Sequence, residues 1–332
     1  MLQVKNASPF APAIAVLPNR EGIDTLYIVV KATFTLYPRL AIAPKQVPPV
    51  LGDEYWGDPA RSSLKYAGEV HIGKRSTDVV LVGQAWAPSS RPISEGGAMM
   101  AVAERRKVVR VYGDRFWKSG SSFTAPEPFV SMPLVYERAF GGSHLVSPDG
   151  PHLMEERNPV GVGFVGKRSR SELIGERLPN IEDPRHPIES LGDVAPPAGF
   201  GFVAPGWLPR RPFAGTYDEV WRKKRAPYLP RNFNLRFLNA AAPELTFERY
   251  LRGGEPVEAL GVSRDGAIRF SLPLCTLRAS VRISGRDEGP RFNLETVLIE
   301  PDENRVCLSW RATLPCDKEV LKVETVAIEL AD

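Results

Sequence analysis

The stretch T-L-Y-I-V-V-K-A-T-F-T-L, residues 25–36, sets the fold class of this chain. Apolar side chains recur at every second position from Leu26 to Leu36, and polar residues such as Lys31 and Thr33 stand between them. A period of two is typical of a strand in an antiparallel sheet that buries one of its faces. The segment therefore predicts a half-buried strand, and Pro38 breaks the pattern just beyond it.

Other segments with alternating or continuous apolar character predict further strands. They are residues 78–86, 108–112, 277–284, 292–298, 306–314 and 319–330. The first of these, D-V-V-L-V-G-Q-A-W, is apolar on both faces and predicts a central strand that is covered on both sides. Residues 292–298 and 306–314 flank a polar turn, which is the pattern of a β-hairpin.

Helix signals are few. Thr216 and Glu219 match a capping box, and the cations of residues 222–225 suit the C-terminal end of a helix dipole, so a helix is predicted over 217–225. A second short helix is predicted over residues 243–251. We therefore expect a mainly β fold of antiparallel sheets, arranged as a sandwich or as two packed β-rich halves, with one or two short helices.

A long irregular segment occupies the middle of the chain, about residues 132–238, and is rich in glycine, proline, aromatic residues and arginine. Loops longer than about 12–15 residues are uncommon in compact domains and are usually functional or disordered. Because this segment is dense in aromatic anchors, we expect it to be ordered and to meet a partner. We divide the chain into residues 1–130, the irregular segment 131–240 and residues 241–332, which together are also compatible with one continuous domain.

Composition narrows the class of protein. The chain has 332 residues, of which 32 are proline, and proline is excluded from helix interiors, so a long helical bundle is ruled out. The net charge of +4 is mild. Basic clusters at residues 105–110 and 222–225 have acidic residues around them, so they predict solvated surface rather than a nucleic-acid interface.

The expected compartment follows from cysteine usage and from the N-terminal residues. The chain has three cysteines, an odd number, and their spacing shows no pairs: Cys275, Cys307 and Cys316. This usage is typical of a protein in a reducing environment. Residues 1–10 lack the features of a signal peptide, and no stretch approaches the roughly 18 apolar residues of a membrane span. We expect a cytoplasmic protein without a membrane partner.

A metal site can be considered around His144 and His152, which lie near Asp149, Glu155 and Glu156. Metal-binding helices and fingers carry tight spacings such as H-E-x-x-H or paired C-x-x-C, and neither is present. The pattern favours ordinary loop histidines, and no metal or cofactor is expected.

Acid–base chemistry can be considered at Glu182 and Asp183, which share a proline-bounded loop with His186. Aspartate also forms turns by accepting hydrogen bonds from its own backbone, and we favour that interpretation. The sequence contains no G-x-S-x-G, no G-x-x-x-x-G-K-[ST] and no G-x-G-x-x-G that opens a helix after a strand. These observations predict a protein that is not an enzyme.

Aromatic and basic residues crowd together between residues 200 and 228. Trp, Tyr and Arg dominate the energetics of protein interfaces, although the same rings could instead pack the segment onto a sheet. We take the cluster as a candidate partner-binding surface. Its members are Trp207, Arg210, Arg211, Tyr217, Trp221 and Tyr228.

An ordered set of short segments carries a resemblance to a known family. The segments are N-A-S-P-F (6–10), V-V-K-A-T-F (29–34), T-D-V-V-L-V-G-Q-A (77–85), Y-E-R-A-F-G-G (136–142), N-P-V-G-V-G-F (158–164), L-P-N-I-E-D-P (178–184), P-A-G-F-G (197–201), Y-D-E-V-W (217–221) and P-Y-L-P-R-N-F (227–233). Together they resemble accessory proteins of the bacterial type VI secretion system, long catalogued only as a domain of unknown function. The chain departs from that pattern at Asn232 and Asn234, where acidic residues are expected.

The resemblance implies a non-catalytic adaptor or chaperone. Such a protein binds the N-terminal or spike-tip region of a cognate toxin effector and helps to load it onto the secreted spike, whose own protein is a second expected partner. The competing interpretation is a carbohydrate-binding or carbohydrate-hydrolysing β protein, because antiparallel sandwiches host many such sites and aromatic rims suit sugar stacking. That alternative requires Glu182 or Asp183 to face the aromatic residues with perturbed acidity.

Overall fold

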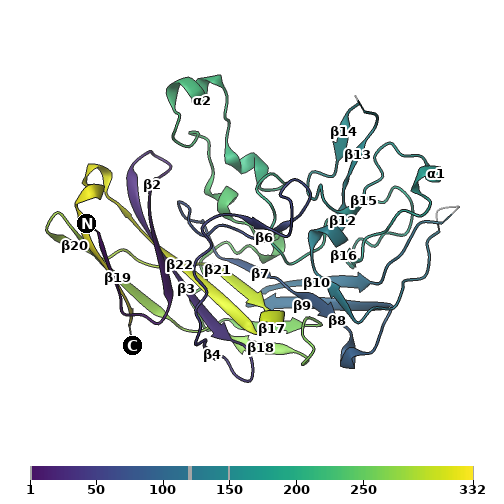
Figure 1. Cartoon of the computed structure of the whole chain (residues 1–332), viewed down its shortest axis with the longest axis horizontal. Helices are drawn as coiled ribbons and strands as arrows, with labels where there is room; N and C mark the ends of the chain where they lie inside the picture. The colour runs from purple at the N-terminus through teal and green to yellow at the C-terminus, as the bar shows by residue number, and fades with distance from the viewer. Residues whose placement is uncertain (1, 119–121, 149, 332) are drawn as a thin grey trace.

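The computed structural model describes residues 2–118, 122–148 and 150–331. Strands form 39% of the structure and helices 11%, in several antiparallel sheets, so the prediction of a mainly β fold is confirmed. The molecule is elongated, with the sheets in its body and an arm that carries helix α2 (Glu219–Lys224) standing away from them (Figure 1).

A six-stranded sheet forms the centre of the molecule and combines strands from both ends of the chain. Its order is β2 (Ala11–Pro18), β3 (Asp24–Thr35), β22 (Arg305–Pro315), β21 (Asn293–Glu300) and β7 (Asp78–Leu81), with β4 (Ala41–Ile42) also pairing with β3. Strand β7 runs parallel to β21, and the other pairs are antiparallel. The predicted hairpin of residues 292–314 is confirmed as β21 and β22.

Strand β3 is buried on both faces, so the prediction of a half-buried strand is wrong. Residues 25–34 are all buried, including Lys31 and Thr33 at 2% exposure each. The loop that follows β4 covers the polar face: Thr33 N donates to Gln46 Oε1 at 2.8 Å, and Val47 N donates to Thr33 Oγ1 at 3.0 Å. Polar side chains occur on this face because it meets polar loops, and not because it meets water.

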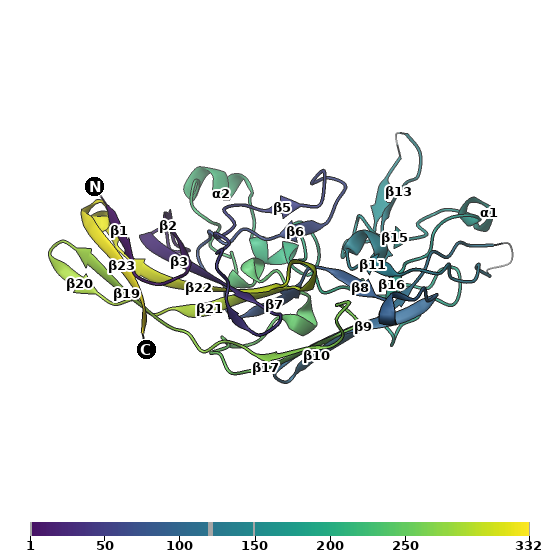
Figure 2. The same cartoon turned by 60° about the horizontal axis from the view of Figure 1, so that its bottom comes forward.

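A five-stranded antiparallel sheet lies along one side of the central sheet, as Figure 2 shows from a second direction. Its order is β16 (Ile181–Glu182), β10 (Arg105–Tyr112), β9 (Glu95–Val102), β17 (Pro256–Leu260) and β18 (Ile268–Ser271). Buried side chains from this sheet, such as Met100 and Val109, belong to the same hydrophobic core as Val79 and Val306 of the central sheet. The predicted strand at residues 108–112 is confirmed as part of β10.

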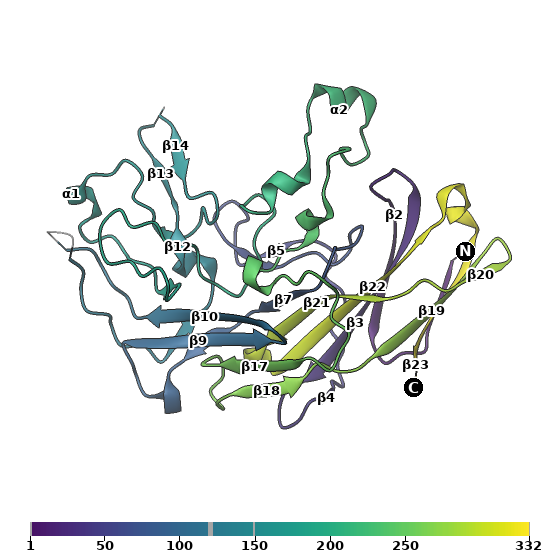
Figure 3. The ribbon, with the colours of Figure 1, turned by 180° about the vertical axis from the view of Figure 1, so that it is seen from behind.

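A four-stranded sheet carries both termini at one end of the molecule (Figure 3). Its order is β1 (Gln3–Asn6), β23 (Val323–Ala331), β19 (Thr276–Ile283) and β20 (Arg286–Glu288). Burial along β19 alternates residue by residue, which confirms the alternating strand predicted there. The strand predicted from residue 319 begins later, because Asp317–Lys322 forms a 3-10 helix.

Three other predicted elements are corrected. The segment 78–86 divides into β7 and β8 (Gln84–Trp86), and β8 pairs with β11 (Ser131–Pro133) instead of continuing the central sheet. Residues 243–251 form only a 3-10 turn, Pro243–Leu245. Helix α2 lies within the predicted range, but its cap is Asp218, whose carboxylate accepts from Trp221 N at 2.8 Å, and not Thr216.

The irregular middle segment is held by several very short elements. These are β12 (Phe140–Gly141), β13 (Ser143–Leu145), β14 (His152–Met154), β15 (Val162–Gly163) and helix α1 (Arg170–Leu173), whereas the short pair β5 (Glu54–Tyr55) and β6 (Leu64–Tyr66) lies earlier in the chain. Asn158 is fully buried and donates to the carbonyl oxygens of Tyr136, at 2.8 Å, and Phe140, at 3.0 Å. A Cβ at Gly141 would collide with the Asn158 carbonyl, so this close approach requires glycine. Two of the segments quoted above, Y-E-R-A-F-G-G and N-P-V-G-V-G-F, thus pack directly on one another.

Three buried ion pairs lie on or beside the central sheet, and a fourth, between Arg115 and Glu182, lies at the edge strand β16 of the five-stranded sheet. The atoms of the three pairs at the central sheet are Lys31 Nζ and Glu69 Oε2 at 2.8 Å, Lys74 Nζ and Asp78 Oδ2 at 2.6 Å, and Arg311 Nε and Glu295 Oε2 at 2.8 Å. Each of these six side chains is at most 10% exposed. A buried charge is tolerated only when it is paired and hydrogen-bonded, and here the three cations and three carboxylates balance.

Candidate functional site

The most prominent surface feature is an arm formed by residues 213–234, with α2 at its tip (Figures 1 and 3). Its base is closed by Asn234 N, which donates to Phe213 O at 2.9 Å. The Asn232 amide accepts from Thr216 N at 3.0 Å and donates to Thr216 Oγ1 at 2.9 Å. A carboxylate at this position could accept from both the amide and the hydroxyl of Thr216, so the asparagine preserves these two contacts without adding a negative charge.

The tip of the arm exposes aromatic surface on a fixed frame. The Trp221 indole donates to Tyr228 O at 2.8 Å, and its ring meets Tyr217 edge-on with 4.7 Å between centroids. Tyr217 remains 53% exposed, Tyr228 39% and the neighbouring Val220 61%. Trp221 therefore organises the tip, while the other three side chains meet solvent.

The arm is also braced against the turn between β2 and β3. Arg225 Nη2 donates to Arg20 O at 2.7 Å, and Arg225 Nε donates to Leu229 O at 2.9 Å within the arm. The same guanidinium lies 5.4 Å from the centroid of the Tyr228 ring. These contacts hold the exposed rings in one position relative to the central sheet.

The other three predicted site residues lie nearer the body of the protein. Trp207 is buried and packs edge-on against Tyr136, with 5.7 Å between ring centroids. Arg210 is only 7% exposed and donates to the carbonyl oxygens of Phe237 and Val203. Arg211 is about half exposed and forms an ion pair of 2.8 Å with Glu156. The six residues thus separate into an aromatic trio on the arm and three residues near its base.

A cavity of about 560 Å³ opens at the base of the arm, and we call it the arginine pocket. Its charged lining residues are Arg75, Arg105, Arg210, Arg236 and Glu248. The remaining lining residues are mainly apolar or uncharged: Ser76, Pro209, Phe213, Asn239, Ala241, Pro243, Thr246 and Phe247. Four cations and one anion give the lining of this cavity a formal net charge of +3.

The guanidinium groups of the pocket have few anionic partners. Glu248 approaches Arg105 only to 3.7 Å and its own side chain is 93% exposed. Within residues 2–118, 122–148 and 150–331, no carboxylate forms an ion pair with Arg75, Arg210 or Arg236. Burial lowers the pKa of the Arg210 guanidinium, because desolvation penalises its charged form.

Most of this pocket was not identifiable from the sequence. Among the charged lining residues, only Arg210 is in the predicted partner-binding cluster, and Arg105 is in the basic cluster predicted to be solvated surface. Another member of that basic cluster, Lys107, is in fact buried and pairs with Glu244 at 2.9 Å, so that prediction is wrong for Lys107. Arg75 and Arg236 come from segments 161 positions apart, so no local motif could have brought them together.

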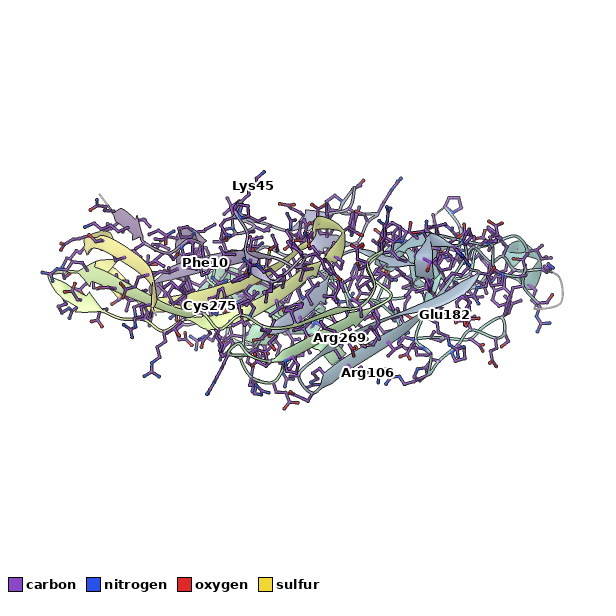
Figure 4. The ribbon with its side chains drawn as sticks, turned by 90° about the horizontal axis from the view of Figure 1, so that it is seen from below. Phe10, Lys45, Arg106, Glu182, Arg269 and Cys275 are labelled. Atoms are coloured by element: carbon purple, nitrogen blue, oxygen red, sulfur yellow. The ribbon has the colours of Figure 1, made fainter. Side chains whose placement is uncertain are left out.

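Both carboxylates of the candidate acid–base loop, Glu182 and Asp183, are held by arginines. Glu182, labelled in Figure 4, is buried, pairs with Arg115 and accepts from Ile188 N at 3.2 Å. Asp183 pairs with Arg185 at 2.7 Å and also accepts from Arg185 N at 2.9 Å. The hydrogen bonds from Arg185 lower the pKa of Asp183 to about 2. This is the turn chemistry predicted for the loop, and it keeps Asp183 ionised.

The other chemical candidates remain dispersed. His144 and His152 lie on the paired strands β13 and β14, whereas Asp149 lies outside the described residues. In the part of the chain that the structure describes, no three His, Cys, Asp or Glu side chains gather so as to hold a metal ion. Over the same residues, no helix is long and apolar enough to cross a membrane.

A second cavity, of about 660 Å³, is the best place to consider the carbohydrate alternative. It is lined by Trp56, Tyr66 and several carboxylates, among them Glu300. However, Lys65 Nζ lies 4.8 Å from the Trp56 ring centroid, so one face of this ring already carries a cation. Glu300 is held by Tyr66 at 2.6 Å and by Arg305 at 2.6 Å.

Fold and site together define a mainly β protein with a braced aromatic arm above a cationic pocket. Residues 21–311 match a family described as an uncharacterized protein conserved in bacteria (DUF2169), and the chain belongs to this family. No curated protein and no solved structure matches the chain.

Proposed function

We propose that this protein is a non-catalytic cytoplasmic adaptor that binds the N-terminal or spike-tip region of a type VI secretion toxin effector and helps to load it onto the spike. Two lines of reasoning support the proposal. The ordered sequence segments resemble type VI accessory proteins, and the arm presents aromatic side chains away from the body of the fold. Neither line depends on an arrangement of catalytic groups.

The arm carries the proposal because its exposed rings are pre-positioned. Ordering flexible side chains on binding opposes association, so anchors that are already fixed bind more tightly. Trp221 and Arg225 fix the tip through backbone carbonyls, and Tyr217 and Tyr228 stay accessible. Tyrosine and tryptophan are the residue types that contribute most to binding at interface centres.

The test is co-expression with the toxin encoded beside the gene, followed by size-exclusion chromatography and titration of the purified partners. The variant Tyr217→Ala/Val220→Ser/Tyr228→Ala removes exposed surface but keeps Trp221 and the braces. We expect it to lose at least about tenfold in affinity, which corresponds to about 1.4 kcal/mol. The matched control is Leu274→Ala/Leu321→Ala, which removes side chains that are 79% and 95% exposed elsewhere.

A toxin that elutes separately from the wild-type protein, and whose solubility does not change, would refute the adaptor proposal. Equal affinity in the arm variant and the control would move the interface away from the arm. Binding on a glycan array that depends on Trp56 would instead support the carbohydrate alternative.

A further inference from the structure

We propose that the arginine pocket binds the carboxylate side chains of a short acidic peptide segment that also carries apolar residues. This inference deepens the proposed function and rests on it only for the identity of the partner that supplies the segment. The capture of acidic peptides by the pocket can be measured without that partner.

Charge is the first reason. Desolvating a guanidinium without a paired anion is costly, and a carboxylate ligand offsets that cost through short, charge-assisted hydrogen bonds. Arg210 is buried with only neutral carbonyl acceptors, and Arg75 and Arg236 enter the same cavity without carboxylate partners among the described residues. The planar guanidinium matches a carboxylate with two parallel hydrogen bonds.

The apolar part of the lining is the second reason, and it favours a peptide over a bare anion. Phe213, Phe247, Pro209 and Pro243 share the cavity with the arginines. A volume of about 560 Å³ lies within the range of cavities that take ligands of several side chains. A free phosphate would leave these apolar walls without a partner.

Acidic residues beside the pocket argue against a nucleic acid. Glu248 lines the opening and is 93% exposed, and Glu104, which contacts Arg249 at 3.3 Å, is 58% exposed. Glu244 follows Pro243 in the chain, but its carboxylate is paired with Lys107 at 2.9 Å. A continuous phosphate backbone would meet these like charges, whereas a peptide can place one or two carboxylates inside and neutral residues at the opening.

The pocket is continuous with the proposed partner surface. Two 3-10 helices flank the base of the arm, and we call them its legs: Arg211–Ala214 supplies Phe213 to the lining, and Leu235–Leu238 supplies Arg236. The Arg236 guanidinium lies 5.7 Å from the centroid of the Phe213 ring, so the legs also contact one another at the opening. One extended segment could therefore contact the arm and place its acidic side chains at the base.

The experiment uses the full chain and an array of short synthetic peptides that alternate Asp or Glu with Leu or Phe. Each peptide has a counterpart carrying Asn or Gln instead. Binding of the best pairs is then measured by fluorescence anisotropy for the wild-type protein and for Arg75→Gln/Arg236→Gln. Both substituted side chains are exposed, so the fold should tolerate the change. The control Arg91→Gln/Arg278→Gln alters the net charge equally at exposed positions outside the pocket.

We expect capture of acidic peptides over their neutral counterparts, a loss of about tenfold or more in the pocket variant, and little change in the control. Equal binding of acidic and neutral peptides, or an equal loss in both variants, would overturn the inference. Tighter binding of inorganic phosphate or of a single-stranded RNA oligonucleotide than of any acidic peptide would also overturn it. If the protein binds acidic peptides but does not bind the toxin, this inference stands and the adaptor proposal fails.

Discussion

Replacing Asp78 with Asn should be one of the most damaging single substitutions of a polar residue in this protein. The Asp78 side chain is fully buried at the start of β7. It accepts from Lys74 Nζ at 2.6 Å, Ala240 N at 2.7 Å and Asn239 Nδ2 at 3.0 Å. The substitution preserves size and shape but removes the negative charge and introduces an NH₂ group where only donors approach.

The expected cost follows from the environment of the pair. Breaking a buried ion pair by removing one partner typically costs about 3–5 kcal/mol, because the remaining charge is left uncompensated. Lys74 is then left buried with Thr296 Oγ1, at 2.8 Å, as its remaining side-chain acceptor. With a urea m-value of about 3 kcal/mol/M, the loss lowers the unfolding midpoint by about 1–1.7 M.

Urea unfolding followed by tryptophan fluorescence measures this shift, with Asp265→Asn as the matched control at an exposed position. The control should change the free energy of unfolding by less than about 0.5 kcal/mol. The double variant Lys74→Met/Asp78→Asn should lower the free energy of unfolding by less than the sum of its single variants. Each single substitution leaves one buried charge without its partner, whereas the double variant removes both charges. A loss below about 1 kcal/mol for Asp78→Asn, or strict additivity in the double variant, would refute this account.

Three further predictions concern other parts of the chain. Gly141→Ala should cost more than about 2 kcal/mol in urea unfolding because its Cβ collides with the Asn158 carbonyl, while Gly206→Ala, which has open space around it, should be close to neutral. The pKa of Asp183 is about 2 in the folded protein, against about 3.9 in the unfolded chain. The ionised carboxylate therefore stabilises the fold fully above about pH 4, and this stabilisation is lost as the pH falls toward 2. Asp183→Asn should flatten the acid side of a stability–pH profile, and an unchanged profile would contradict this assignment. Burial raises the pKa of the Cys275 thiol to about 11. At about pH 8, alkylation of Cys275 by iodoacetamide should therefore be slower than alkylation of free cysteine by on the order of a hundredfold. Mass spectrometry measures this rate, and an equal rate for both thiols would show an accessible thiolate.

The strands were largely predictable because apolar periodicity reports directly on a pleated, buried surface. The alternation of β19 and the hairpin of β21 and β22 follow the sequence closely. The same reasoning failed for the polar face of β3, where period-two patterning indicates water but the structure supplies a covering loop and a buried Glu69 for Lys31. Periodicity distinguishes apolar from polar faces, but it does not reveal what the polar face contacts.

The site was predictable only where its residues are neighbours in sequence. Tyr217, Trp221 and Tyr228 lie within one arm, so their clustering survives folding. Arg75 and Arg236 line the same pocket only because segments far apart in sequence lie side by side in the fold. Charge counts along the chain could not indicate this pocket, because its positive character depends on which carboxylates fail to reach it.

Residues that line the arginine pocket also form hydrogen bonds to the buried Asp78 in the core. Asn239 lines the pocket on one side, and its amide donates to Asp78 in the buried ionic cluster behind it. Thr246 also lines the pocket, and its hydroxyl donates to Asp78 Oδ1 at 3.3 Å. Asp53 and, to a smaller extent, Asp78 favour the charged form of Arg210 from a distance, and Asp78 forms its ion pair with Lys74 instead. The carboxylate that neutralises Lys74 in the core therefore also offsets part of the cost of burying the Arg210 guanidinium, which forms no ion pair with a carboxylate in the described chain.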